Sequence, residues 1–197
     1  MANNKLSPHF RLNEFCVTSS GANVVQANRE YASQPENIAK LTELSNKILE
    51  PIRAELIKSF GLKFMTITSG VRTAGTKIAN ASATSQHNHC EAVDFVITGK
   101  LEDTVKLFRL IMEGKIKGLD LKYIGQCILE RRQRRDGTWS TWIHISLKTK
   151  RFINQRKASK NRNYTVFPEF MISLNGYKYV PVSEEAIEHY LDKDYIC

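Results

Sequence analysis

The sequence of 197 residues predicts an α+β fold: a small, mostly antiparallel sheet flanked by helices, with a basic C-terminal extension. Long stretches with apolar residues at steps of three and four indicate amphipathic helices. Short runs rich in β-branched residues, bounded by turn-forming residues, indicate strands.

The first long helix is predicted at 35–60. Pro51 falls inside this range, where it removes a backbone hydrogen bond and clashes with the preceding turn, so we expect either a kink or a second helix that starts there. Gly61 is suited to end the helix. The apolar positions form one stripe: Ile38, Leu41, Leu44, Ile48, Ile52, Leu56 and Phe60.

Strands are predicted at 64–68 and 92–97, and a further helix at 101–112. Alternation along the second strand places Asp94 on the face opposite its apolar neighbours. Two more strands, at 123–131 and 139–147, are joined through RRDGT and are expected to form a hairpin.

The patterns weaken after Lys148, so we expect a main domain at 1–148 and, at 149–197, a C-terminal extension or small appended subdomain. Within the extension, SLNGYKYVPV indicates a hairpin, and Ser183 is suited to cap a short helix.

The net charge of +9 is local. Residues 131–162 hold eleven Lys or Arg and one acid, a sum of +10, so the rest of the chain sums to −1. Such a segment could meet nucleic acid, an anionic cell-wall polymer, or only solvent. It has few aromatic residues of the kind that stack on bases, which argues against nucleic acid.

The four cysteines lie far apart without a CxxC pair, which argues against a disulfide scaffold and against a four-cysteine zinc site. No apolar run approaches the roughly 18 residues of a membrane span. The start, MANNKLSPHF, lacks the pattern of a secretory signal, so we expect synthesis in the cytoplasm without a signal peptide.

Two separate stretches supply metal-binding side chains. SQHNHCEAVDF at 85–95 contains His87 and Asp94, and TWIHIS contains His144 between two isoleucines that should face the core. Two imidazoles and a carboxylate match the three protein ligands of an open catalytic Zn²⁺ site. Taken alone, the first stretch could also be a polar turn.

These stretches resemble the zinc D-Ala-D-Ala carboxypeptidase family, which shares its fold with the hedgehog signalling domain, and in particular its phage and bacterial branch. The family signature, Ser-x-His, two residues, Gly-x-Ala-x-Asp, matches Ser85, His87, Ala92 and Asp94, with Cys90 at the Gly position. LSPHFRLNEF, LEPIR, ITSGVR and WIHIS extend the resemblance from about residue 6 to about residue 147.

The resemblance implies that His87, Asp94 and His144 hold Zn²⁺, and that Arg72 stabilises the carbonyl oxygen as negative charge develops on it. Ser85 would either bind substrate or cap a turn. Family members commonly have a Glu three residues before the last histidine as the proton acceptor, and this chain has Thr141 there.

Glu130 is our candidate for the missing base. If the hairpin loop has an odd number of residues centred on Gly137, Glu130 lies directly across from His144, and the apolar side chains share the other face. A two-residue Asp136-Gly137 turn would instead bury the carboxylate on the core face, at considerable cost. The alternatives are that Glu130 only pairs with an arginine such as Arg131, and that Asp136 is the base.

Together these features predict a zinc metallopeptidase acting on peptidoglycan stem peptides, either as a D-alanyl-D-alanine carboxypeptidase or as an L-alanyl-D-glutamate endopeptidase like related phage endolysins. It would act at the bacterial cell wall after release from the cell or as part of a phage particle, where the basic segment could contact anionic wall polymer. Thr141 keeps an alternative open: a catalytically inactive zinc-binding virion or wall-binding module.

Overall fold

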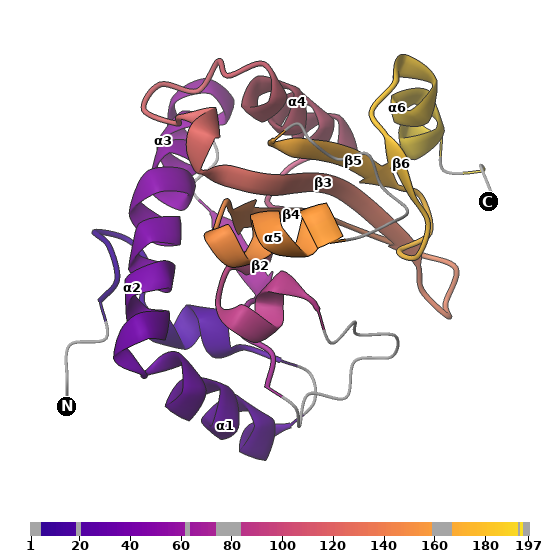
Figure 1. The fold of residues 1–197 in the computed structure, drawn as a ribbon. Helices are drawn as coiled ribbons and strands as arrows, with labels where there is room; N and C mark the ends of the chain where they lie inside the picture. The colour runs from indigo at the N-terminus through magenta and orange to yellow at the C-terminus, as the bar shows by residue number, and fades with distance from the viewer. Residues whose placement is uncertain are drawn as a thin grey trace.

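The computed structural model describes residues 5–18, 21–61, 64–73, 84–158, 167–192 and 194. It confirms the α+β class, with helices packed around a six-stranded, mostly antiparallel sheet (Figure 1). Within these residues, no helix is both long enough and apolar enough to cross a membrane. The α-helices are α1 (Ala22–Ala32), α2 (Pro35–Leu44), α3 (Glu50–Phe60), α4 (Leu101–Met112), α5 (Lys150–Ala158) and α6 (Glu184–Leu191).

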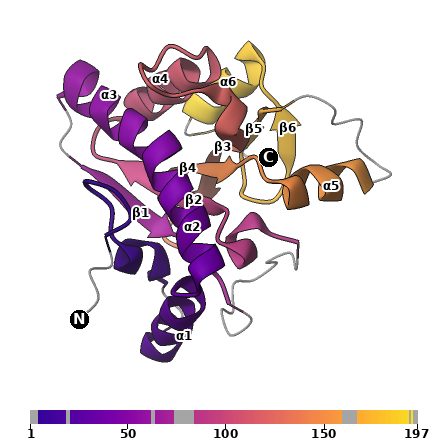
Figure 2. The ribbon, with the colours of Figure 1, turned by 60° about the vertical axis from the view of Figure 1, so that its left-hand side comes forward.

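The predicted first helix is one long rod made of α2, a π-helical turn at Ser45–Leu49, and α3 (Figure 2). Pro51 stands in the first turn of α3, as the second of our two alternatives expected. The wider turn before it changes the hydrogen bonding, because the Glu50 N–H bonds to the Ser45 carbonyl five residues back. Gly61 ends the rod in the left-handed conformation, with φ of +61°.

The six strands lie in the order β1-β2-β4-β3-β5-β6, and every neighbouring pair is antiparallel except β3 and β5. The predicted bounds of β2, β4 and α4 are confirmed to the residue, and those of β1 and β3 to within two residues. The strands are β1 (Met65–Ser69), β2 (Ala92–Ile97), β3 (Ile124–Gln133), β4 (Trp139–Leu147), β5 (Glu169–Ser173) and β6 (Tyr179–Pro181).

One face of the sheet belongs to the hydrophobic core. Its side chains include Val93, Phe95, Leu129, Ile143 and Ile145, all essentially without solvent exposure. Helices α2 and α4 contact β4. Because side chains alternate along a strand, the residues between these positions point to the opposite face, where the polar groups gather.

The predicted register of the β3–β4 hairpin is wrong by two residues. Ile128, not Glu130, lies across from His144, and Glu130 lies across from Trp142. The loop has an odd number of residues, as expected, but it spans 134–138 and is therefore centred on Asp136. A shift of two preserves the alternation, so Glu130 keeps the polar face that the sequence predicted for it.

The C-terminal residues extend the same sheet. β5 and β6 form the hairpin expected around SLNGYKYVPV, and Ser183 caps α6 by accepting a hydrogen bond from the Ala186 N–H at 3.1 Å. Ile187 and Tyr190 of α6 join the main core. Residues 149–197 were predicted as an extension or appended subdomain, and their described part shares both the sheet and the core of the preceding residues.

Candidate metal centre

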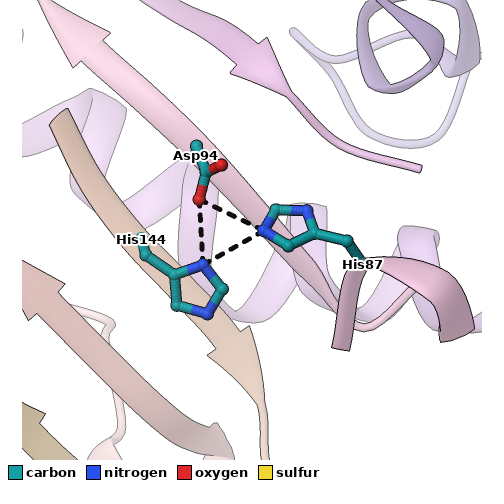
Figure 3. A group of neighbouring side chains, drawn as sticks. All are labelled: His87, Asp94 and His144. Carbon is teal, nitrogen blue, oxygen red and sulfur yellow. Dashed lines mark hydrogen bonds and ion pairs between the residues drawn. The ribbon is translucent and has the colours of Figure 1, made fainter. Parts of the chain in front are cut away.

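Three elements bring the predicted ligands together (Figure 3). His87 lies on the short 3-10 helix η3 (Gln86–His89), Asp94 on β2 and His144 on β4. Asp94 and His144 are direct cross-strand partners, so sheet pairing fixes their spacing. The Arg72 N–H donates to the His87 carbonyl at 3.2 Å, which ties η3 to the segment after β1. All three ligand side chains are buried.

The converging atoms are His87 Nε2, His144 Nδ1 and Asp94 Oδ1. The two nitrogens lie 3.2 Å apart, and they lie 3.2 and 2.9 Å from the carboxylate oxygen, respectively. Tetrahedral bonds of about 2.0–2.1 Å would put neighbouring ligand atoms about 3.3 Å apart. The group can therefore hold a metal ion with only a slight expansion.

The outer nitrogen of each imidazole is already engaged. His87 Nδ1 lies 2.6 Å from the Gly70 carbonyl, which can only accept a hydrogen bond, so that nitrogen carries the proton. His144 Nε2 lies 3.4 Å from Gln86 Oε1. The Gln86 amide is oriented by its Nε2, which donates to Ser146 Oγ at 2.6 Å, so an acceptor oxygen faces His144.

In its neutral form, each histidine therefore presents an unprotonated nitrogen to the centre. Together with the Asp94 oxygen, three acceptors face one another at hydrogen-bond distance. Such an arrangement is repulsive unless a positive charge lies between them. A metal ion meets that requirement, and fixation of the outer nitrogen is how ligating histidines are normally oriented.

The protonation states also suit a metal. Burial lowers the pKa of His87, which favours the neutral imidazole. Burial alone would raise the pKa of Asp94, but the positive charges and hydrogen bonds of His87 and His144 in their protonated forms outweigh burial and hold that pKa well below its usual range. A bound cation would take the place of those imidazole protons. An ionised carboxylate and a neutral imidazole are the ligand forms that bind metal.

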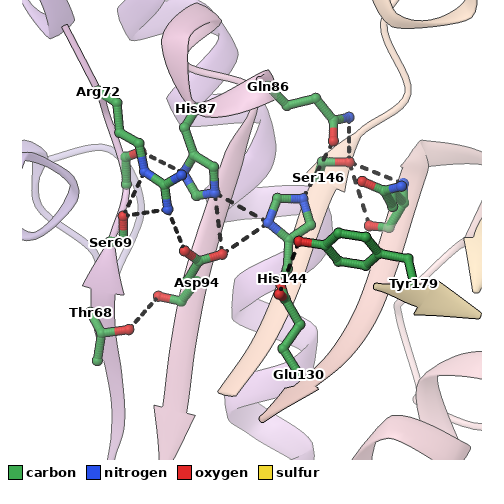
Figure 4. Close-up of polar contacts among 12 residues, drawn as sticks. Thr68, Ser69, Arg72, Gln86, His87, Asp94, Glu130, His144, Ser146 and Tyr179 are labelled. Carbon is green, nitrogen blue, oxygen red and sulfur yellow. Dashed lines mark hydrogen bonds and ion pairs between the residues drawn. The ribbon is translucent and has the colours of Figure 1, made fainter. Parts of the chain in front are cut away.

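Arg72 binds the predicted metal ligand Asp94 directly in this structure (Figure 4). Its Nη2 lies 2.7 Å from Asp94 Oδ2, the oxygen that does not face the histidines. Nε and Nη2 also donate to Ser69 Oγ at 3.1 and 3.0 Å. The guanidinium thus orients Asp94, and any role toward substrate would fall to its remaining donors.

Glu130 lies on the same face of the sheet, beside the centre (Figure 4). Burial and the negative charge of Asp94 raise the pKa of Glu130 to about 8, against the lowering effects of hydrogen bonds from Trp142 and Tyr179 and of the Arg72 charge. A carboxyl group with a pKa near neutrality is suited to accept and return a proton.

The other predicted candidates lie as follows. Ser85 directly precedes η3, half-buried, and its side chain makes no capping hydrogen bond there. Asp136 is exposed in the hairpin loop, where its carboxylate accepts hydrogen bonds from Thr138. Arg131 points to the opposite face, where Nη1 donates to the Tyr190 and Asp192 carbonyls.

Thr141 also points away from the centre. It lies an odd number of positions before His144 on a regular strand, so its side chain leaves on the other face, where it hydrogen-bonds Tyr190. A carboxylate at position 141 would not reach the ligands in this strand geometry. Glu130, on the neighbouring strand β3, instead points to the face of the metal centre.

Cys90 stands where the signature of the zinc D-Ala-D-Ala carboxypeptidase family has a glycine. Its φ is +57°, a left-handed conformation that favours glycine, and the turn it makes leads from η3 into β2. Burial raises the pKa of its thiol to about 12. The residue is therefore a protonated, buried turn residue, and it is not one of the three converging ligands.

The site residues that were not anticipated from the sequence include Gln86, which orients His144, and Tyr179, which contacts Glu130. Gln86 stands inside the same signature stretch as His87, so its position gave a usable signal. Tyr179 gave none, because it reaches the site from β6.

No family model matches the chain, and neither the curated proteins nor the solved structures contain a significant match to it. The resemblance to the zinc carboxypeptidase family therefore stays a prediction that rests on the motifs themselves.

Proposed function

We propose that this protein is a zinc-dependent peptidase that hydrolyses peptidoglycan stem peptides. The observation that carries the proposal is the juxtaposition of an acceptor-only cluster, His87, Asp94 and His144, with the buried carboxyl group of Glu130 on the same face of the sheet. Two imidazoles and a carboxylate leave a fourth position open, as in catalytic zinc sites. The choice of zinc and of a cell-wall substrate comes from the motif resemblance.

When bound, zinc would supply Lewis acidity, which polarises a scissile carbonyl and makes a water molecule easier to deprotonate. Glu130 accepts the proton of the attacking water and delivers it to the leaving amine. Arg72 orients Asp94 through Oδ2, and its remaining N–H donors stabilise the negative charge on the carbonyl oxygen. Gln86 and the Gly70 carbonyl keep the two imidazoles in the ligating tautomers.

Two bonds of the stem peptide are candidates: the terminal D-Ala-D-Ala bond and the internal L-Ala-D-Glu bond. The first requires recognition of a free carboxylate next to the scissile bond, whereas the second requires a groove open at both ends. We propose that the protein acts at the bacterial wall, after release from a cell or within a phage particle.

The decisive experiment incubates the zinc-loaded protein with defined muropeptides and identifies the products by mass. We expect Glu130→Gln to keep the fold and the zinc but to lose about 10² to 10⁴ in rate, the usual worth of a positioned general base. Asp136→Asn is the matched control and should retain activity.

Near-normal turnover by Glu130→Gln would remove Glu130 from the role of base. Complete inactivity of the unmodified zinc-loaded protein on all muropeptides would contradict the peptidase proposal and favour an inactive zinc-binding wall or virion module.

A further inference from the structure

Glu130 belongs to a row of residues that crosses four strands. Trp142 on β4 pairs with Glu130 on β3, Glu130 pairs with Ser173 on β5, and Ser173 pairs with Tyr179 on β6. Directly paired residues point to the same face of a sheet, so all four side chains lie on the face of the metal centre. The row runs beside the Asp94–His144 pair.

The small side chain in the middle of this row leaves room above it. Neighbouring strands lie about 4.8 Å apart, so β3 and β6 are separated by roughly 10 Å, a distance that a tyrosine and a glutamate can bridge only if the intervening residue is small. Ser173 is fully buried between them, and its Oγ accepts a hydrogen bond from the Gly176 N–H at 3.1 Å. The Tyr179 hydroxyl lies 3.4 Å from Glu130 Oε2 (Figure 4).

From this geometry we infer that Tyr179 is a positioning residue for the base, supplied by the C-terminal hairpin. Its hydroxyl donates to Glu130 Oε2 and, with the Trp142 side chain, orients the carboxylate so that the other oxygen faces the metal centre. This inference rests on the proposed function. It assigns a role to residues 167–192, which lie outside the stretch that resembles the peptidase family.

The direction of the hydrogen bond follows from the surroundings. Burial and the negative charge of Glu130 raise the pKa of Tyr179, so the phenol keeps its proton and is the donor when Glu130 is ionised. The charged groups that act on Glu130 are Asp94, which disfavours a second negative charge, and Arg72, which favours it. The two hydrogen bonds that favour the ionised form come from Trp142 and Tyr179.

The test compares Tyr179→Phe with Tyr177→Phe. Tyr177 is a matched control because it lies on the same hairpin and is similarly exposed, at 50% against 39% for Tyr179, but its ring packs against Arg132, at 4.9 Å. We expect Tyr179→Phe to lower kcat about 3- to 10-fold, the usual net contribution of one hydrogen bond, with KM and zinc content little changed. The acid limb of the kcat/KM profile should move to higher pH, because the ionised base has lost a donor. Tyr177→Phe should behave as the unmodified protein.

A double-mutant cycle separates positioning from a general structural effect. If Tyr179 acts through Glu130, adding Tyr179→Phe to Glu130→Gln should cause no further loss of rate, since the base is already gone. Full additivity, or an unchanged pH profile in Tyr179→Phe, would overturn the inference.

A readout without turnover keeps the inference testable if the peptidase proposal fails. The ¹³C carboxyl signal of Glu130, assigned by its absence in Glu130→Gln, can be titrated in the zinc-loaded protein. We expect Tyr179→Phe to move this titration to higher pH and Tyr177→Phe to leave it in place. An unmoved signal would contradict the contact itself, whereas a moved signal in an inactive protein would contradict only the peptidase function.

Discussion

The metal centre and the C-terminal region reach the same face of the sheet by different routes. The three ligands come from η3, β2 and β4, where β2 and β4 are antiparallel neighbours and η3 precedes β2 by two residues. The C-terminal region instead joins through β5, which pairs in parallel with β3, and β6 then carries Tyr179 back toward Glu130. The ligand set thus depends on two short motifs, whereas the orientation of the proposed base depends on the pairing of β3 with β5, a strand far from it in the sequence.

The charged residues of the metal centre and those of the basic segment at 131–162 are also arranged differently. At the metal centre, charged and polar groups converge on one point. In the basic segment, several cations are anchored to acids of the main fold: Arg151 binds Glu91, which is 1% exposed, and Arg156 Nη2 binds Glu169 Oε2 at 2.8 Å. These arginines attach α5 to the sheet, so only part of the segment's charge faces solvent.

The largest effect is expected from removing a ligand. His144→Ala should lower zinc affinity on the order of a hundredfold, because structural zinc sites of roughly 10–16 kcal/mol divide into about 2.5–4 kcal/mol for each of four ligands. Metal analysis after dialysis against a weak chelator measures this loss. His89→Ala is the matched control, since His89 lies on the same helix as His87 but outside the ligand group. Undiminished zinc in a folded His144→Ala protein would exclude His144 as a ligand.

A smaller loss of zinc affinity is expected from substituting Gln86, which contacts the predicted ligand His144 and is not itself a predicted ligand. Gln86→Leu removes the acceptor that faces His144 Nε2 at 3.4 Å. Zinc affinity should fall about 10-fold, the lower end of the usual cost of losing such a partner. Competition titration with a chromophoric chelator measures the change.

Gln86→Glu keeps an acceptor oxygen at the same place and should retain or increase the affinity. If Gln86→Leu and Gln86→Glu lost zinc equally, the effect would lie in packing at η3 and not in the orientation of His144.

The sequence predicted what depends on neighbouring residues. Alternation in AVDFVI and TWIHIS placed Asp94 and His144 on the polar face, because moving either side chain to the core would bury a polar group among apolar ones. The loop register was wrong by two residues because such a shift changes no side chain's face, so hydrophobicity alone did not determine it. The pairing of β5 with β3 could not be predicted, because parallel strands are joined by a long connection whose sequence does not specify their register. The contact of Tyr179 with Glu130 depends on that pairing and could not be predicted either.

The smallest effect is expected from the exposed part of the basic segment, and it tests whether the anchored and exposed cations have separate roles. Arg135, Lys150 and Lys157 are exposed. Reversing all three to Glu should weaken binding to purified sacculi on the order of 10-fold at low salt, since each charge reversal costs about 0.5 kcal/mol, and the difference should shrink at high salt. Cleavage of a small soluble muropeptide should persist, because none of the three contacts the metal centre.

The control for this prediction reverses Lys58, Lys115 and Lys117, three exposed lysines outside the segment, and so changes the net charge equally. If both triple variants lost sacculus binding to the same extent, attachment would depend on net charge alone. If only the variant in the basic segment lost it, the attachment site would lie in that segment. Arg151 and Arg156 are left in place in both proteins, because removing either would leave a buried carboxylate, Glu91 or Glu169, with fewer partners and would destabilise the fold.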